Sequence, residues 1–323
     1  MPNAIRVHKV GGPEALKWEP VEDGEPGPGQ VRLRQHAAGL NFIDVYHRTG
    51  LYPLPLPFTP GVEGAGVIEA VGDDVTNVSV GDRVAYAGPV GGYAEVRLID
   101  AEKVVRLPDA IDFDQAAGMM LQGMTARMLL RSVFPVTAGD TILIHAAAGG
   151  VGLIMCQWAA TMGATVIGTV STEEKAELAR AHGCAHTIVH GKQDFVAEVE
   201  RITEGAKLPV IYDSVGRDTF MRSLDCLRPR GLMVSFGQSS GPVEPIAPTL
   251  LAQKGSIYLT RPTLFHYTAS REQLERSAAE LFEVVGSGKV IIEVKQRYPL
   301  SDAAEAQRAL EARQTTGSTV LTI

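Results

Sequence analysis

The chain has 323 residues, of which 45% are hydrophobic and 21% are charged, and its formal net charge is −7. This length suits two domains rather than one core, and an acidic balance without long runs of one sign argues against a nucleic-acid-binding surface. The three cysteines form no Cys-x-x-Cys pair and no apolar run is long enough to span a membrane, so we expect a reduced, cytoplasmic protein without a membrane anchor.

The first third of the chain predicts a β-rich unit. Short apolar or alternating runs are separated by Gly, Pro, Asp and Asn, which is typical of strands joined by tight turns. A proline-rich stretch, residues 51–60, excludes helix there and favours an extended loop. The expected strands are Val31 to Gly39, Gly66 to Val71, Arg83 to Ala87, Tyr93 to Leu98 and Lys103 to Leu107.

From Asp112 the pattern changes to helices alternating with strands. A helix is expected over Phe113 to Leu130, and then six strands alternate with helical segments, which predicts a doubly wound parallel sheet of the dinucleotide-binding type. The six strands are Thr141 to Ala146, Thr165 to Val170, Thr187 to Val189, Val210 to Asp213, Leu232 to Phe236 and Ile257 to Leu259. The tail after Pro262 is too short to fold alone, so we expect it to pack against the N-terminal unit.

The strongest local motif is the glycine-rich stretch from His145 to Gly152, which follows a strand and opens a helix. Read as Ala147-x-Gly149-x-x-Gly152, it predicts a tight turn at Ala147, close approach of a pyrophosphate at Gly149, and close helix–strand packing at Gly152. The N–H groups at the start of the helix would bind the anion. The alternative is a purely structural turn.

The end of the next strand predicts which nucleotide binds. A site for NAD usually has an acidic residue about 20 residues after the loop, and this strand ends in Val170-Ser171 without one. Ser171 and Lys175 would suit a 2′-phosphate, so we favour NADPH. The alternative is that Ser171 or Thr172 caps the helix and Lys175 is a solvated charge near two glutamates.

The motifs together resemble a known family. The stretches Asn41 to Gly50, Pro60 to Gly66, Gly81 to Arg83 and Ala146-x-x-Gly149-x-x-Gly152 are similar to those of the medium-chain dehydrogenase/reductase superfamily, in its quinone oxidoreductase branch that includes zeta-crystallin. The resemblance implies a Rossmann domain, residues 123–261, inserted into a GroES-like β-rich catalytic domain formed by residues 1–122 and 262–323. It also implies a homodimer through edge strands of the Rossmann domains.

The resemblance also bears on metal binding. Zinc-dependent members of the superfamily carry a Cys where this chain has Asn41 and a His where it has Val62, followed by Glu63. Neither replacement can hold zinc here, and the four-cysteine lobe of those members is missing. We therefore expect no metal and a zinc-independent reaction.

The resemblance further implies which residues line the site. Asn41, Asp44, Tyr46 and Tyr52 would line the cleft for nicotinamide and quinone, and Arg261 and Arg313 would approach the nicotinamide half from the tail. The residues expected to contact NADPH are Asn41, Gln122, Thr125, Gly149, Gly150, Val151, Ser171, Lys175, His190, Ser214, Val215, Gly216, Phe236, Gly237 and Arg313. His190 stands where related members often have a tyrosine against the 2′-phosphate.

These residues predict NADPH-dependent reduction of a quinone by transfer of a hydride or of electrons. Without a metal, the charge that develops on the substrate oxygen must meet hydrogen-bond donors, for which Asn41, Tyr46, Tyr52 and Arg261 are the candidates. The alternative for each tyrosine is packing, and for Asp44 it is capping a short helix. Competing functions are an NADPH-dependent enone reductase and, more distantly, an NADPH-binding structural or RNA-binding protein.

Overall fold

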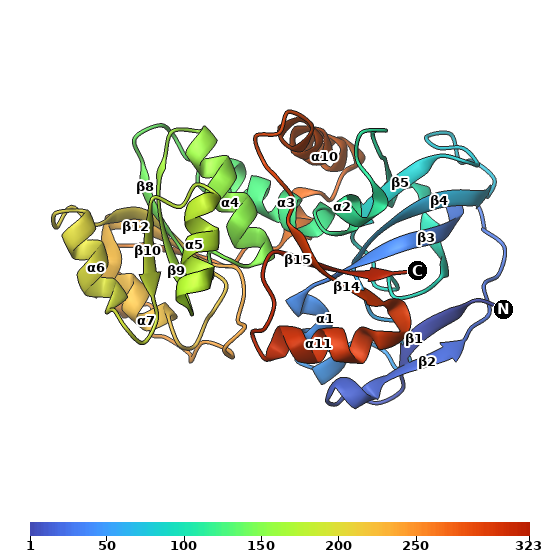
Figure 1. Ribbon diagram of the computed structural model, residues 1–323, viewed down its shortest axis with the longest axis horizontal. Helices are drawn as coiled ribbons and strands as arrows, with labels where there is room; N and C mark the ends of the chain where they lie inside the picture. The colour runs from blue at the N-terminus through green and yellow to red at the C-terminus, as the bar shows by residue number, and fades with distance from the viewer. The chain divides into compact units, whose positions relative to one another are not determined.

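A computed structural model describes all residues of the protein, 1–323, as two compact units (Figure 1). Unit 1 comprises Met1–Met124, Thr268–Gly286 and Ile292–Ile323, and unit 2 comprises Thr125–Tyr267 and Ser287–Ile291. No helix combines the length and the apolar character that crossing a membrane requires.

Unit 2 is built on a six-stranded sheet in which every neighbouring pair is parallel. The strands are β8 (Thr141–Ile144), β9 (Thr165–Val170), β10 (His186–Val189), β11 (Leu208–Asp213), β12 (Leu227–Ser235) and β13 (Tyr258–Thr260). Their spatial order is β10-β9-β8-β11-β12-β13. The chain first adds strands on one side of β8 and then, from β11, on the other side. This is the order of the dinucleotide-binding fold, so the predicted doubly wound sheet is confirmed.

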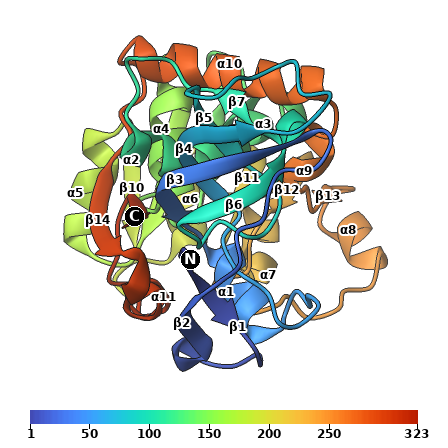
Figure 2. The ribbon, with the colours of Figure 1, turned by 90° about the vertical axis from the view of Figure 1, so that its right-hand side faces the viewer.

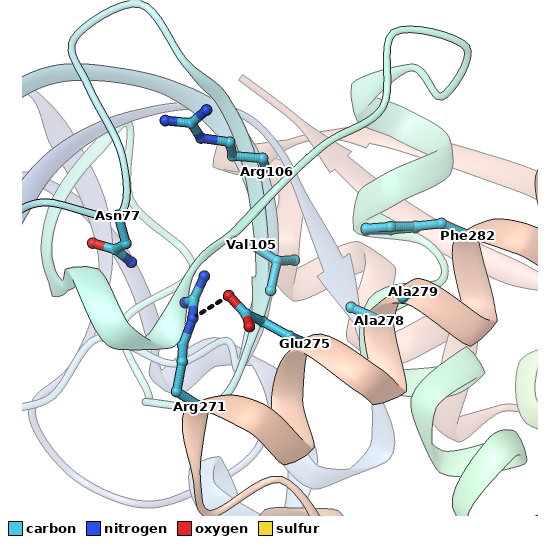
Figure 3. A pocket seen from close by; sticks show the side chains of 8 residues that line it. All are labelled: Asn77, Val105, Arg106, Arg271, Glu275, Ala278, Ala279 and Phe282. Atoms are coloured by element: carbon cyan, nitrogen blue, oxygen red, sulfur yellow. Dashed lines mark hydrogen bonds and ion pairs between the residues drawn. The ribbon is translucent and has the colours of Figure 1, made fainter.

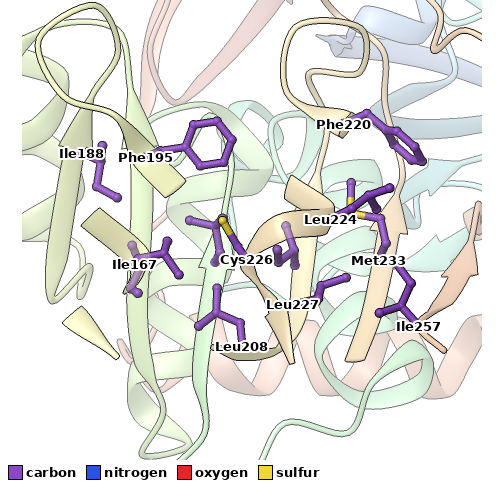
Figure 4. Packing of buried hydrophobic residues seen from close by; sticks show 13 residues of the cluster. Ile167, Ile188, Phe195, Leu208, Phe220, Leu224, Cys226, Leu227, Met233 and Ile257 are labelled. Atoms are coloured by element: carbon purple, nitrogen blue, oxygen red, sulfur yellow. The ribbon is translucent and has the colours of Figure 1, made fainter. Parts of the chain in front are cut away.

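Helices cover the sheet of unit 2. They are α4 (Gly150–Thr161), α5 (Glu173–Ala181), α6 (Phe195–Ile202), α7 (Phe220–Ser223), α8 (Thr249–Gln253) and α9 (Leu264–Tyr267). Figure 4 shows how α6 and α7 bury one face: Phe195 and Phe220 pack with sheet residues such as Ile167 and Met233. Burying an aromatic side chain of this kind contributes roughly 1.5–3 kcal/mol relative to leaving it exposed.

Unit 1 contains a seven-stranded sheet and a separate hairpin (Figure 2). The strands of the sheet are β3 (Gln30–Leu40), β4 (Glu63–Val71), β5 (Arg83–Ala87), β6 (Val96–Asp100), β7 (Val105–Arg106), β14 (Val294–Pro299) and β15 (Ser318–Thr322). The C-terminal strand β15 pairs antiparallel with β3, which confirms that the tail packs on the N-terminal unit. The remaining helices of the chain are α1 (Phe42–Thr49), α2 (Phe113–Ala117), α3 (Met120–Met128), α10 (Arg271–Gly286) and α11 (Ala303–Glu311).

Some elements differ from the prediction. The hairpin of β1 (Asn3–Val7) and β2 (Leu16–Pro20) and the helix α1 were not expected. The single helix expected over Phe113 to Leu130 is broken into α2 and α3, because at Gly118 the chain leaves the first helix and its carbonyl accepts a hydrogen bond from the Ser318 hydroxyl at 2.6 Å.

Candidate active site

The glycine-rich loop joins β8 to α4. The N-cap of α4 is Gly149 in extended conformation, and neither a capping side chain nor an acidic residue satisfies the first turn. By contrast, α5 is capped by Thr172 and α6 by Asp194. The first-turn N–H groups of α4, from Gly150 onward, are therefore those suited to a phosphate, and this chemistry fits the pyrophosphate of a dinucleotide.

The two glycines of the motif have different surroundings. A Cβ added at Gly149 would have Ala146 O, at 3.3 Å, as its nearest neighbour, so this side of the loop has room for a ligand. A Cβ at Gly152 would overlap the backbone of Ala146 and Ala147, as expected for close helix–strand packing. The tight turn lies one residue earlier than predicted, because it is Ala146 that has a positive φ, of 54°, while Ala147 is buried.

A buried histidine supports the start of the loop. The two ring nitrogens of His145 lie 2.9 Å from the hydroxyls of Thr169 and Ser223, which come from β9 and α7. Burial lowers the pKa of His145 to about 4, although the charge of Asp213 opposes that shift. A neutral imidazole therefore ties β8 to its neighbours. From the sequence, His145 was visible only as the first residue of the glycine-rich motif.

The residues between β9 and the first turn of α5, Ser171 to Lys175, include those expected to contact a 2′-phosphate. The hydroxyl of Thr172 accepts a hydrogen bond from the backbone N–H of Lys175 at 3.3 Å, so Thr172 acts as the helix cap. Ser171 is exposed and Lys175 is half-buried. The carboxylate of Glu173 pairs with Lys192 at 2.8 Å, which offsets one of the two nearby negative charges.

His190 is the third residue expected near the 2′-phosphate. It is exposed and directly follows β10, and its ring stacks on that of His145 with a centroid distance of 6.5 Å. Its contact with a phosphate stays a prediction.

The loops after β11 and β12 are held by charged residues. The carboxylate of Asp213 accepts hydrogen bonds from the N–H groups of Val215 at 2.7 Å and Gly216 at 3.0 Å. Thus Asp213, a buried residue that the sequence analysis did not select, shapes the predicted segment Ser214 to Gly216. Parallel strands place these loops at the same edge of the sheet as the glycine-rich loop.

Arg261 contacts the loop after β12. Its guanidinium donates to the carbonyls of Ser235 at 3.3 Å and Gly237 at 3.2 Å, and to the side-chain oxygen of Gln238 at 3.2 Å. Arg261 therefore holds the predicted segment Phe236–Gly237. Its approach to the nicotinamide stays a prediction.

The remaining predicted site residues lie mostly in unit 1, where Tyr46 and Tyr52 form a pair. Their rings meet edge to face with centroids 5.2 Å apart, and the backbone N–H of Tyr52 donates to the carbonyl of Tyr46 at 3.0 Å. Tyr46 is buried on α1, and Tyr52 is half-buried in the loop that follows. The pair brings two aromatic rings and two hydroxyl groups close together.

Five polar side chains form a buried network in the same unit. The Asn41 amide donates to Glu63 Oε2 at 2.7 Å and accepts from Gln122 Nε2 at 3.1 Å. Asp44 Oδ2 accepts from the Asn41 backbone N–H at 2.9 Å and from the Tyr93 hydroxyl at 2.8 Å. Three predicted residues, Asn41, Asp44 and Gln122, are thus brought together. Asp44 also accepts the backbone N–H of Asn41 at the start of α1, which is the helix-capping role given above as its alternative.

The two acids of the network hold protons unusually well. Burial raises the pKa of Asp44 to about 7, against hydrogen bonds from Asn41 and Tyr93 that lower it. Burial also raises the pKa of Glu63 to about 8, and the negative charge of Asp44 adds to that rise. At neutral pH Glu63 is therefore mostly protonated, and Asp44 is about half ionised.

Glu63 and Tyr93 were not among the site residues predicted from the sequence. A signal for Glu63 existed, because it is a glutamate at the start of the largely apolar run that forms β4. Nothing in the sequence marked Tyr93, whose partner Asp44 lies 49 positions away. Of the other predicted residues, Thr125 lies in unit 2, and Arg313 lies in unit 1, exposed just after α11.

A groove of about 460 Å³ lies elsewhere in unit 1, between α10 and β7 (Figure 3). Arg271 crosses it, paired with Glu275 at 2.8 Å and donating to the carbonyl of Val104. None of the predicted site residues lines this groove.

Comparison with known proteins agrees with this architecture. Residues 27–109 match the family described as "Alcohol dehydrogenase GroES-like domain", and residues 150–283 match "Zinc-binding dehydrogenase". An open parallel sheet with a glycine-rich loop after its first strand, together with a GroES-like unit, defines the class of medium-chain dehydrogenases/reductases.

Similar proteins narrow the class. The chain is 53% identical to a quinone oxidoreductase of Pseudomonas aeruginosa, with 99% of each chain covered, and 49% identical to a 2-haloacrylate reductase of Burkholderia, with 98% of each covered. The structure of Escherichia coli quinone oxidoreductase complexed with NADPH superposes with a TM-score of 0.98 at 46% identity, over 99% of this chain and 100% of that one. The chain belongs to the zeta-crystallin-like quinone oxidoreductase branch of the medium-chain dehydrogenase/reductase superfamily.

Proposed function

We propose that the protein is an NADPH-dependent quinone reductase that works without a metal. The observation that carries the proposal is the uncapped, glycine-rich N-terminus of α4 directly after β8. It lies at the reversal point of the sheet, where this fold binds dinucleotides. The similarity to proteins named quinone oxidoreductase, one of them in complex with NADPH, supports both the acceptor and the cofactor.

Within this proposal, unit 2 binds the nucleotide and unit 1 supplies the substrate side. NADPH would deliver the hydride when bound. Gly149 to Val151 would bind the pyrophosphate, and Ser171 and Lys175 the 2′-phosphate. Two loop segments would contact the nicotinamide half of the cofactor: Ser214–Gly216, held by Asp213, and Phe236–Gly237, held by Arg261. His190, Gln122, Thr125 and Arg313 complete the proposed set of contacts.

The unit 1 residues fit a flat, neutral acceptor. The Tyr46–Tyr52 pair presents aromatic surface and hydroxyl donors, and Asn41 presents an amide. Because Glu63 is mostly protonated at neutral pH, it does not repel the negative charge that develops on a reduced quinone oxygen. A reduced quinone can take its protons from water, so the proposal needs no essential general acid.

A second candidate is reduction of an activated carbon–carbon double bond, which the 49% identity to a 2-haloacrylate reductase favours. The decisive experiment is a steady-state comparison of NADPH oxidation with quinones, simple enones and 2-haloacrylates. We expect the highest kcat/KM with quinones, and a clear preference for NADPH over NADH. A higher kcat/KM with enones or haloacrylates would replace the first candidate by the second.

The proposal extends to assembly and location. Strand β13 is an edge of the unit 2 sheet and exposes Tyr258 and Leu259, which supports a homodimer through this edge. All three cysteines are buried and free, as suits a reducing cytoplasm. The net charge of −7 supports a small-molecule substrate rather than a nucleic acid as partner.

A further inference from the structure

The buried network contains an unbranched chain of hydrogen bonds that starts at a backbone carbonyl and ends at a carboxyl group. The Ser318 hydroxyl lies 2.6 Å from the carbonyl oxygen of Gly118 and 2.8 Å from Gln122 Oε1. Gln122 then contacts Asn41 at 3.1 Å, and Asn41 contacts Glu63 at 2.7 Å. All four side chains are at most 8% exposed, so water cannot supply missing partners freely.

In one direction of the chain, Asn41 donates to Glu63 and Gln122 donates to Asn41. The chain then has one hydrogen too few at Ser318. A serine hydroxyl has one hydrogen, yet two oxygen atoms, of Gly118 and Gln122, both lie at acceptor distance from Ser318. One of them is left without that hydrogen, and an unsatisfied buried acceptor costs about 1–3 kcal/mol. The oxygen and nitrogen of a side-chain amide occupy nearly the same volume, so either amide can be turned by half a turn without moving its neighbours.

Turning both amides resolves the count. Ser318 then donates to Gly118, Gln122 Nε2 donates to Ser318, and Asn41 Nδ2 donates to Gln122 Oε1. The last acceptor, Asn41 Oδ1, needs a donor from Glu63, which only the protonated carboxyl provides.

We propose that Glu63 is a protonated positioning residue, whose carboxyl hydrogen is donated to Asn41 Oδ1 and fixes the direction of the whole chain from Glu63 to Gly118. The other carboxyl oxygen of Glu63 accepts from the backbone N–H of Leu121 at 2.7 Å. Every polar atom that links the five groups then has a partner of the right kind. Loss of the proton reverses both amides.

The groups around Glu63 favour its proton. The ionisable side chains facing it are Asp44 from α1, Tyr86 from β5 and Tyr93 from the loop before β6. None of them is cationic. The guanidinium of Arg97 lies over the ring of Tyr86, 4.8 Å from its centroid, and is not among the groups that shift the pKa of Glu63. Burial and the Asp44 charge both raise the pKa of Glu63, to about 8.

The consequence for catalysis rests on the proposed function, in which Asn41 lies beside the nicotinamide and the substrate. The protonated state of Glu63 determines which side of the Asn41 amide carries the donor. Turnover should therefore fall as Glu63 loses its proton.

The direct test is a pH titration of wild-type protein carrying ¹³C at the glutamate side-chain carboxyls, followed by NMR. Glu63 is the only glutamate among the buried residues, so one glutamate signal should titrate near pH 8, well above the ordinary value of 4.5. Glu63→Gln should remove this signal. Glu69→Gln, at a partly exposed site on the same strand, should retain it. If every glutamate titrates below about pH 6, near the range usual for this side chain, the proposal is wrong.

Activity gives an independent second readout. With a pKa near 8, the protonated fraction of Glu63 falls about tenfold between pH 7 and pH 9, so the wild-type ratio of kcat at these pH values should be about ten. The side-chain amide that Glu63→Gln introduces donates to Asn41 at every pH, so this ratio should approach one, whereas Glu69→Gln should keep the wild-type ratio. An unchanged ratio in Glu63→Gln overturns the role in positioning. Because the NMR result needs no substrate, failure of the quinone assignment is distinguishable from failure of this inference.

Discussion

Glu63 shows how one carboxyl group can be accommodated in a protein interior without a cation. It lies against strand β3 at Gly39, where any Cβ would overlap the Glu63 side chain and the carbonyl of Ala117. Its oxygens are bound by a side-chain amide and a backbone N–H rather than by an ion pair. An isolated buried charge is expensive, so such a group keeps its proton instead, and Asp44 follows the same rule.

This arrangement makes stability depend on pH. The pKa values of Glu63 and Asp44 are higher in the folded protein, about 8 and 7, than the ordinary values of 4.5 and 3.8. The folded protein therefore binds protons that the unfolded chain has released. Their contribution to stability is fully present below about pH 4, and it is lost as the pH rises through 7 for Asp44 and 8 for Glu63.

We expect Glu63→Gln to remove part of this dependence. Each such group changes the free energy of unfolding by about 1.4 kcal/mol per pH unit within its window. In urea unfolding at pH 5.5, 6.5 and 7.5, the wild-type free energy should fall more steeply than that of Glu63→Gln. The Glu69→Gln variant should follow the wild type. Parallel slopes for all three proteins would show that Glu63 is already ionised at pH 5.5.

At the level of elements, the repeating strand–helix units could be predicted from the sequence, whereas α1 could not. The strands β8 and β9 match their predicted ranges within two residues, because their apolar runs are continuous and end at polar residues. The buried residues of α1 include Asp44, His47 and Arg48. At 8 residues, α1 is shorter than the window of about 11–18 residues over which helical periodicity is read, so the sequence pattern did not mark it.

The loop between β8 and α4 permits a clean test. Gly149 has φ of −79° and its added Cβ would have nothing nearer than Ala146 O at 3.3 Å, so Gly149→Val should fold. The branched side chain would occupy the space proposed for the pyrophosphate, so NADPH binding should weaken at least tenfold, or about 1.4 kcal/mol. Fluorescence titration with NADPH measures this, and thermal unfolding checks the fold.

The matched comparison is Gly152→Ala, three residues further along. Its Cβ would overlap the backbone of the loop itself, so this smaller change should destabilise the protein more than Gly149→Val does. A folded Gly149→Val variant that binds NADPH with wild-type affinity would show that the loop is only a structural turn.

The residues that follow β9 should discriminate between NADPH and NADH. Lys175 lies on the first turn of α5, and a charge-assisted bond from its ammonium to a 2′-phosphate is worth about 1.5–3 kcal/mol. Glu174 reduces this gain, so Lys175→Ala should raise the Kd for NADPH about tenfold and leave that for NADH nearly unchanged. Lys192→Ala serves as the comparison, since Lys192 pairs with Glu173. Equal losses for both nucleotides in Lys175→Ala would indicate a general electrostatic effect.

For the whole molecule, the sequence predicted the order of the segments but not the network they assemble. The tail was expected on the N-terminal unit because it is too short to fold alone, and β15 does pair with β3. The buried network, however, draws single residues from distant segments: Ser318 contacts Gln122 across 196 positions, and Asn41 contacts Glu63 across 22. No local pattern encodes such pairings, because each partner is an isolated polar residue in an ordinary element.

The proposed homodimer can be tested at the edge strand β13. This strand pairs with β12 on one side only, and its residues Tyr258 and Leu259 are 62% and 38% exposed. An edge with unpaired N–H and C=O groups and apolar side chains pairs readily with a second copy, and lysines introduced there oppose such pairing by charge repulsion. We expect the wild type to have the mass of a dimer in size-exclusion chromatography with light scattering, and Tyr258→Lys/Leu259→Lys to shift it toward the monomer. The control Met221→Lys, at another exposed apolar position of unit 2, should stay dimeric. A wild-type monomer, or a double variant that remains a dimer at low micromolar concentration, would rule out this edge as the interface.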